Sequence, residues 1–206
     1  PAEFKEEYSS QIPALQLLIN MGYTYLTPDE ALALRDDKTD NVVLSGVLKP
    51  WLREHNHCDY KGRHVPFNES NIRSAFDQLT TIEWGQGMIP VNQSMYENLL
   101  SNGISLTQTI DGDKRGYTLK YIDFEHPENN VYHVTDEFSV KRRKTNDHRR
   151  PDIVVFVNGI PLVVIECKRS DLKTSSKENP VFQGITQHLR NQEWHDEIPQ
   201  LYVYSQ

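Results

Sequence analysis

Apolar residues recur at helical spacing through much of the first half of the chain, with polar positions between them. They predict four helices, over about residues 11–21, 44–52, 70–79 and 96–100. Gly22 and Asn102-Gly103 are typical helix stop signals, whereas Pro50 must kink or interrupt the second helix. We therefore expect a helical first half, about residues 1–103, whose apolar stripes form core.

From about Ile104 the pattern changes to short runs rich in β-branched and aromatic residues, which is typical of strands. The expected strands are ISLTQTI, YTLKYIDF, VYHVTDEFSV, the two arms of the hairpin quoted below, and a last strand LYVYS. DGDKRG at 111–116 has hairpin-turn chemistry, and Pro180 starts a helix over about 180–192. The sequence predicts an α/β (α+β) fold with a sheet core over about 104–206, within a single domain of residues 1–206.

The most unusual stretch is RPDIVVFVNGIPLVVIECKR, residues 150–169, in which two apolar runs meet at Asn158-Gly159. Both runs are apolar nearly throughout, so we expect both faces to be covered and the pair to lie centrally in the sheet. Their outer ends carry Asp152, Glu166 and Lys168. The charges mark either a solvated hairpin end or a site.

The side-chain period of a strand places Glu166 and Lys168 on one face, and Ile165 and Cys167 on the other. Carboxylate oxygens are the ligands that Mg²⁺ prefers, and a nearby ammonium orients or helps to deprotonate a water, or stabilises developing phosphorane charge. With Asp152, these groups supply what metal-assisted phosphodiester hydrolysis requires. A Glu-x-Lys triplet alone is common by chance, and an ordinary exposed pair is the alternative.

The turn decides whether Asp152 and Glu166 can share an ion. In a plain two-residue type I′ turn at Asn158-Gly159, Asp152 would face Ile165 and lie on the opposite face from Glu166. If Gly159 is a bulge, Asp152 opposes Val164, shares a face with Glu166 and sits roughly 7 Å away. We therefore predict a bulged or three-residue turn, or another bulge in this strand pair.

Composition narrows the function classes. The net charge of -7 argues against a protein that holds nucleic acid by its overall field, but KRRKTNDHRR at 141–150 holds six Lys or Arg directly before the hairpin. This basic run is either a solvated turn or a functional surface.

No apolar run approaches the ~20 residues of a membrane helix, and nothing indicates export, so we expect a soluble, cytoplasmic protein. The chain reads as a fragment of something longer.

One further cluster has metal-like residue types. His55, His57 and Cys58 follow the second predicted helix, but their spacing directs adjacent side chains apart. We expect a solvated loop there rather than a zinc site.

RRPDIVVFVNGIPLVVIECKR resembles the PD-(D/E)xK nuclease core, and in particular the version in the restriction (R, HsdR) subunit of type I restriction-modification enzymes. MGYTYL, YIDFEHPENNVYHVTDEFSV, and QGITQHLRNQ followed by EIPQLYVYSQ are also similar to the amino-terminal region of that subunit. The resemblance thus covers most of the chain. It implies a restriction-endonuclease-like core, with a central mixed sheet flanked by helices, in a Mg²⁺- or Mn²⁺-dependent endonuclease domain that makes double-strand breaks in unmodified DNA.

The resemblance also implies residue roles. Asp152, Glu166 and the backbone carbonyl of Cys167 would hold the metal ion, and Lys168 would act on the attacking water. Asp152, Glu166 and Lys168 would thus be the catalytic residues. The side chain of Cys167 points away and is expected in the core. Some related nucleases add an acid from the first helix, where Glu6, Glu7 and the neutral Gln11 lie; none of these is assigned.

DNA contacts are expected from Arg149 and Arg150 at the end of the basic run. Gln187 is carried over as a DNA-binding or site-positioning residue. Many relatives have a Tyr four residues after this Gln, and here Asn191 stands in its place, which puts the Tyr-dependent part of the motif in doubt.

The implied partners are double-stranded DNA and the modification and specificity subunits of the restriction complex, with no membrane. An ATP-driven translocase follows the nuclease in the family's full subunit, but this chain contains no GxxxxGK[ST] phosphate loop. ATP is therefore expected as a cofactor of the full-length subunit only. Two alternatives stand beside the endonuclease: a noncatalytic module that keeps the scaffold and docks partners, and a nuclease of another DNA-processing system.

Overall fold

The computed structural model describes residues 10–168, 180–193 and 197–205. The helices are α1 Ile12–Asn20, α2 Pro28–Ala33, α3 Ser45–His55, α4 Glu69–Thr80, α5 Met88–Ser94, the π-helix η3 Met95–Leu100, α6 Pro180–Glu193 and α7 Pro199–Tyr202, with short 3-10 turns η2 Trp84–Gln86 and η4 Pro127–Asn129. The strands are β1 Thr24–Leu26, β2 His57–Tyr60, β3 Arg63–Pro66, β4 Ile104–Ile110, β5 Asp113–Leu119, β6 Tyr132–Asp136, β7 Val140–Lys141, β8 His148–Arg149, β9 Ile153–Val157 and β10 Ile160–Ile165.

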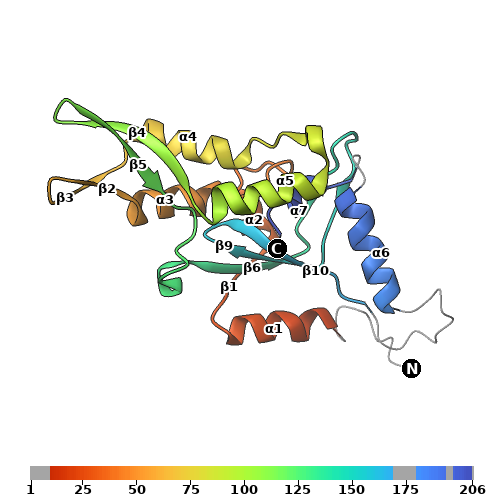
Figure 1. Cartoon of the computed structure of the whole chain (residues 1–206). Helices are drawn as coiled ribbons and strands as arrows, with labels where there is room; N and C mark the ends of the chain where they lie inside the picture. The colour runs from red at the N-terminus through yellow and green to blue at the C-terminus, as the bar shows by residue number, and fades with distance from the viewer. Residues whose placement is uncertain (1–9, 169–179, 194–196, 206) are drawn as a thin grey trace, which may run out of the picture.

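A four-stranded mixed sheet lies at the centre of the molecule, in the order β1-β6-β9-β10. β1 pairs with β6 in parallel, and the other neighbours are antiparallel. Two hairpins, β2–β3 and β4–β5, form separate two-stranded sheets that extend to one side of this core (Figure 1). The predicted fold class, an α+β protein with a mixed sheet flanked by helices, is confirmed.

Strand β9 explains why the quoted hairpin is apolar almost throughout. Ile153 and Val155 pack with Leu15 of α1 on one face, whereas Val154 and Phe156 enter the larger core on the other. Figure 1 shows α1 on one side of the sheet and α3, α4 and α5 on the other. Coverage of both faces is therefore confirmed for β9 but not for the whole of β10, where Val163 is 43% exposed. β10 is an edge strand among the described strands, so the expected central position also holds only for β9.

The helical predictions for the first half are largely confirmed. α1, α3 and α4 match the expected helices, and Pro50 lies inside α3. Gly22 and Gly103 both have positive φ, as helix stops often require. The first half is not purely helical, however, because β1 joins the central sheet and β2–β3 forms a hairpin. None of the helices in the described parts of the chain has the length and apolar character that a membrane crossing needs.

The expected last strand LYVYS is wrong, because its first residues form the end of α7. Pro199 stands at the first turn of this short helix, where its missing N–H costs nothing. The backbone that follows is held by side chains instead of a neighbouring strand: Asn92 donates to the carbonyl oxygen of Val203 at 2.9 Å. Tyr204 is buried and donates its hydroxyl to the carbonyl oxygen of Leu79 at 3.0 Å.

Candidate active site

The Asn158-Gly159 turn is a plain two-residue turn. Val157 pairs with Ile160 and Phe156 with Pro161, and both turn residues have positive φ, 52° and 81°, as a type I′ turn requires. The Asn158 side chain is fully buried, donates to the carbonyl oxygen of Tyr121 and accepts from the backbone N–H of Val131. The predicted bulged or three-residue turn is therefore wrong, because these buried contacts favour the tight form.

The bulge lies further along β10 instead. The register shifts between Pro161 and Val163, so that Val163 pairs with Val155 and Ile165 with Ile153. Proline lacks the N–H of a regular ladder and is typical of bulges. The second form of the prediction, another bulge in this strand pair, is thus confirmed, although Val164 opposes Val154 rather than Asp152.

Continued by one residue, the shifted register sets Asp152 opposite Glu166 on the same face. The backbone N–H of Cys167 donates to Asp152 Oδ2 at 2.6 Å, which ties the two strand ends together. Both carboxylates are partly buried, and the Cys167 side chain lies in the core against α1 as expected. The continued register therefore brings the two acidic residues to the same end of the β9–β10 pair, which we call the rim.

The backbone of Asp152 is held from two other segments. Its carbonyl oxygen accepts from Gln11 Nε2 at 3.2 Å and from the backbone N–H of Glu137 at 3.2 Å. Gln11 is 7% exposed and precedes α1. It contacts the backbone rather than the carboxylate, and Glu6 and Glu7 lie outside the described residues.

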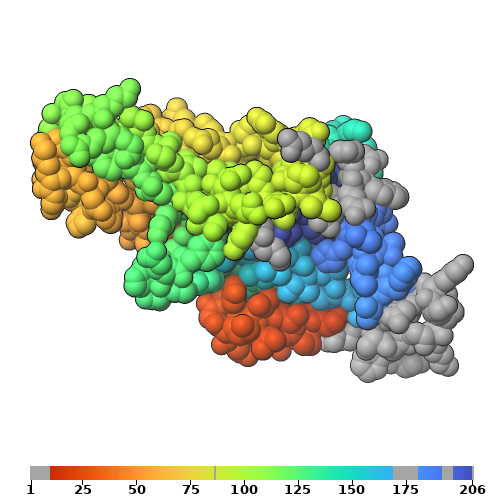
Figure 2. Space-filling model, in the orientation of Figure 1, coloured from red at the N-terminus to blue at the C-terminus, as the bar shows by residue number. Residues whose placement is uncertain are grey.

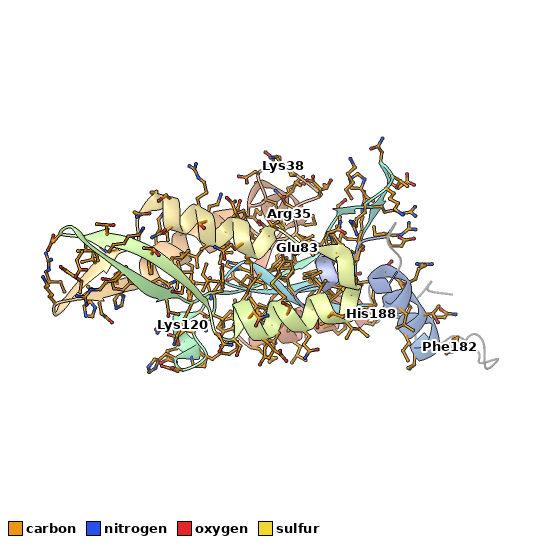
Figure 3. All side chains as sticks on the ribbon, turned by 45° about the horizontal axis from the view of Figure 1, so that its top comes forward. Arg35, Lys38, Glu83, Lys120, Phe182 and His188 are labelled. Atoms are coloured by element: carbon orange, nitrogen blue, oxygen red, sulfur yellow. The ribbon has the colours of Figure 1, made fainter. Side chains whose placement is uncertain are left out.

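Helix α6 lies beside Glu166 and Lys168. Gln187 donates from Nε2 to Glu166 Oε2 at 2.7 Å, so the structure brings this predicted residue onto the carboxylate. A Cβ on Gly184, one turn earlier, would lie 3.8 Å from Lys168 Cγ. The pKa of His188 is lowered, first by burial and then by the positive charge of Lys168. Figure 3 shows His188 on the side of α6 turned toward the body of the molecule, and Phe182 near the outer end.

Three residues near the carboxylates were not among the predicted site residues: His188, Asn191 and Tyr202. Tyr202 on α7 is 2% exposed, and its ring meets that of His188 edge to face with centroids 5.5 Å apart. Burial raises the pKa of the Tyr202 hydroxyl, the charge of Glu166 raises it further, the nearby Asn191 side chain lowers it, and the charge of Asp152 raises it. Where relatives are expected to carry a Tyr on the helix, this chain has a buried Asn191 beside a tyrosine from α7.

The two predicted DNA-binding arginines have different surroundings. Arg149 holds Glu197 with two contacts, Nε to Oε2 at 2.6 Å and Nη2 to Oε1 at 2.9 Å, and Glu197 is 2% exposed. Arg142 also reaches Glu197, at 3.4 Å. Arg150 is exposed. Part of the basic run therefore neutralises a buried carboxylate, while Arg150 faces solvent.

The arrangement places two acidic residues and one lysine within three residues of the same end of β9 and β10 in a mixed sheet. Oxygen ligands beside an ammonium are suited to metal-assisted hydrolysis of a phosphate ester. Asp152 directly precedes β9, and Glu166 and Lys168 follow the end of β10, with α6 beside them.

Comparison with known proteins identifies the family. The model of the type I restriction enzyme R protein N terminus matches residues 3–206. The chain is 28% identical over 215 residues to the putative type I restriction enzyme MjaIXP endonuclease subunit of Methanocaldococcus jannaschii, covering 100% of this chain and 18% of that protein. It is 33% identical over 193 residues to the type I restriction enzyme HindI endonuclease subunit of Haemophilus influenzae, covering 93% of this chain and 17% of that protein.

The chain therefore belongs to the family of type I restriction enzyme R protein N-terminal regions. It spans less than a fifth of the length of these curated relatives.

Proposed function

We propose that this chain is the Mg²⁺- or Mn²⁺-dependent endonuclease domain of a type I restriction enzyme R subunit, and that it hydrolyses DNA phosphodiester bonds to give double-strand breaks. The observation that carries the proposal is the register of β9 and β10, which sets Asp152 opposite Glu166 when it is continued by one residue, together with the hydrogen bond from the Cys167 N–H to the Asp152 carboxylate. Lys168 follows Glu166 by two residues. Family membership and relatives that are named endonuclease subunits support it.

The residues present fit a hard divalent cation, because the side chains at the rim are carboxylates and offer oxygen ligands. In the proposal Asp152 and Glu166 hold the ion, with the backbone carbonyl of Cys167 as a third protein ligand. When bound, Mg²⁺ or Mn²⁺ polarises the scissile phosphate and lowers the pKa of a bound water.

The chain's own groups orient and move the reacting atoms. Lys168, two residues after Glu166, orients the attacking water and helps to remove its proton. Gln187 fixes the orientation of the Glu166 carboxylate through its 2.7 Å hydrogen bond, as groups behind metal ligands commonly do. Buried Tyr202 and Asn191 exclude water from behind the carboxylates, which strengthens their electrostatic effect.

DNA is the proposed substrate, and Arg150 is the better placed of the two predicted arginines because it is exposed. A phosphate contact by Arg149 would have to share or replace its ion pair with Glu197. The first proposed role of Gln187 is to position Glu166, to which it donates a hydrogen bond, and its second is to contact DNA. The acidic chain as a whole is suited to a domain to which DNA is delivered by other parts of an assembly.

We place this domain in a larger cytoplasmic complex with modification and specificity subunits, where ATP serves a translocase in the full-length subunit. The support is that the relatives are named subunits of type I restriction enzymes and are several times longer than this chain. ATP has no assigned role within these 206 residues.

The test is Glu166→Ala in the complete reassembled complex, with ATP-driven translocation and DNA cleavage measured separately. We expect cleavage to fall by at least about 1,000-fold, because a ligand of the reacting centre is lost. Translocation should remain. Glu54→Ala, which removes an exposed carboxylate from α3, should leave both activities unchanged.

Cleavage retained by Glu166→Ala would contradict the catalytic assignment and favour the noncatalytic module. If translocation is also lost, the isostere Glu166→Gln separates a folding defect from a chemical one: cleavage by that complex at the normal rate contradicts the proposal. For the isolated chain we expect weak Mg²⁺ binding and little cleavage, so the complete complex is the system to use.

A further inference from the structure

The β2–β3 hairpin carries a second cluster of metal-ligating residue types, far from the proposed nuclease site. His57 and Asp59 lie two residues apart on β2, and Asp59 pairs directly with His64 on β3. Because side chains alternate along a strand, all three lie on one face, which is exposed. Cys58 and Tyr60 occupy the opposite, buried face.

The sequence suggested a solvated loop here, and that expectation is wrong for His57 and Cys58, which are in a strand. Cys58 does point away from the neighbouring histidine, as the spacing indicated. The third member, His64, is contributed by strand pairing, which a local spacing rule does not detect. His55 is not part of the cluster, because it stacks on Trp51 with ring centroids 4.8 Å apart.

The three ligand atoms are already close together. His64 Nδ1 lies 2.6 Å from Asp59 Oδ1, and His57 Nε2 lies 3.6 Å from the same oxygen. One ligand atom from each residue falls within 4.8 Å of the others, and the two imidazole rings meet at 77° with centroids 4.4 Å apart. In the part of the chain that the structure describes, no other three His, Cys, Asp or Glu residues meet in this way.

These separations suit a small ion with nitrogen and oxygen ligands. Two ligands of one tetrahedral Zn²⁺ lie about 3.3 Å apart, given metal–ligand bonds of about 2.0–2.1 Å. Strand pairing over four residues on each strand fixes the backbone that carries the three side chains. Two imidazoles favour Zn²⁺ and similar transition metals over Mg²⁺ or Ca²⁺, which prefer oxygen.

Nearby cations do not cover this face. Arg63 pairs with Asp111, and Lys61 lies over the Tyr60 ring at 4.8 Å, on the side of the hairpin turned toward β5. A divalent ion would therefore meet two imidazoles and one carboxylate, with at least one coordination position left for water or an external ligand. This ligand count is the one found in sites that keep an open position.

We propose that His57, Asp59 and His64 form a binding site for a divalent transition-metal ion of the Zn²⁺ class. The site stands apart from the carboxylate cluster, because the β2–β3 hairpin lies at the opposite end of the molecule from α6 (Figures 1 and 2). It does not depend on the nuclease assignment.

The test is titration of the purified chain with Zn²⁺ by calorimetry, and with Co²⁺ by its visible absorption, which reports nitrogen and oxygen ligation. Both are done in a Glu166→Ala background, so that the carboxylate cluster does not contribute. We expect one site, and at least a 10-fold loss of affinity in His57→Ala, His64→Ala and Asp59→Asn. All three side chains are exposed, so the variants should stay folded, which circular dichroism checks.

His126→Ala is the matched control, because His126 also lies 3.6 Å from a carboxylate, that of Glu128, and is exposed. It should bind Zn²⁺ as the parent does. The proposal is overturned if the parent shows no Zn²⁺ binding below about 1 mM, or if His57→Ala and His64→Ala bind as tightly as the parent. It is also overturned if His126→Ala weakens binding to the same extent.

Discussion

Two hairpins of this molecule share one turn chemistry and differ in almost everything else. β4–β5 turns at Asp111-Gly112 with φ of 51° and 81°, and β9–β10 turns at Asn158-Gly159 with φ of 52° and 81°. β4–β5 keeps one unbroken register over seven pairs, and β4 alternates buried and exposed positions. β9–β10 carries a bulge, and β9 is buried along most of its length.

In these hairpins the turn reverses the chain, whereas the strands set which residues lie opposite one another. A positive-φ Asx-Gly pair reverses the chain in both places, so the turn cannot be what distinguishes the hairpin with paired carboxylates. The extra residue in β10 sets Asp152 against Glu166, and burial between α1 and the main core holds that register. The turn of β9–β10 differs mainly in what surrounds it, and substitution can expose that difference.

The largest expected effect is on the two turn glycines. A Cβ at Gly159 would lie 2.7 Å from the carbonyl oxygen of Leu44, whereas a Cβ at Gly112 meets nothing within 4 Å. Gly112→Ala carries only the cost of a positive φ, about 1–2 kcal/mol. Gly159→Ala adds a backbone clash in a packed core, for a total of about 2–5 kcal/mol. Urea unfolding measures both, and equal losses would show that the two turns are interchangeable.

A smaller effect is expected from one glutamine near each hairpin. Gln187→Ala removes the hydrogen bond to Glu166, so we expect cleavage by the complete complex to fall by about 10- to 100-fold with translocation retained. Gln108→Ala on β4 leaves the backbone groups of Pro66 and Asn68 without their partner, and should cost about 2–3 kcal/mol of stability.

The two glutamine variants should affect different properties, Gln187→Ala cleavage and Gln108→Ala stability. Gln108→Ala, assayed at a temperature where it is folded, should cleave at the normal rate, because β4 lies outside the rim. Normal cleavage by Gln187→Ala would remove α6 from the proposed site.

Local patterns predicted the elements whose signals are local. α1, α3 and α4 followed from apolar periodicity, and β4 followed from its β-branched residues, since each of these elements buries one face against the core. β1 gave no such signal, because it is three residues long and largely exposed. LYVYS was misinterpreted because aromatic and β-branched residues favour strands, whereas here they fill the core from α7 and the residues after it.

In the candidate site, too, the sequence showed the residue types but not the contacts that depend on packing and strand pairing. The residue types of Asp152, Glu166 and Lys168 were readable from the sequence, but the bulge that brings the first two together was not located, since Pro161 was its only mark. Tyr202 was missed because its place beside the carboxylates depends on the packing of α7 against α6. His64 was missed for the related reason that strand pairing, rather than sequence spacing, brings it to Asp59.

The smallest expected effect is on stability at alkaline pH. It comes from Tyr202, which covers the end of β9–β10 where the carboxylates lie. Burial and the nearby carboxylates raise the pKa of Tyr202 in the folded chain, so the unfolded chain ionises first as the pH rises. The stability that neutral Tyr202 contributes is fully present below the ordinary tyrosine pKa of about 10 and is lost as the pH rises toward the folded value. By pH 11 the unchanged chain should have lost about 1.4 kcal/mol more than Tyr202→Phe, measured as the fall in unfolding free energy from pH 8.

Tyr121 and Tyr204 are also buried with raised pKa values, but they are present in both chains, so the difference isolates Tyr202. Tyr96→Phe, at a 40% exposed position on η3, is the control and should follow the unchanged chain. If Tyr202→Phe follows it too, the hydroxyl is hydrated and α7 does not cover the carboxylates. A smaller fall in unfolding free energy for Tyr202→Phe than for the unchanged chain would mean that a buried tyrosine hydroxyl, which resists deprotonation, covers the carboxylates at the end of β9–β10. The open face of β4–β5 differs in this respect.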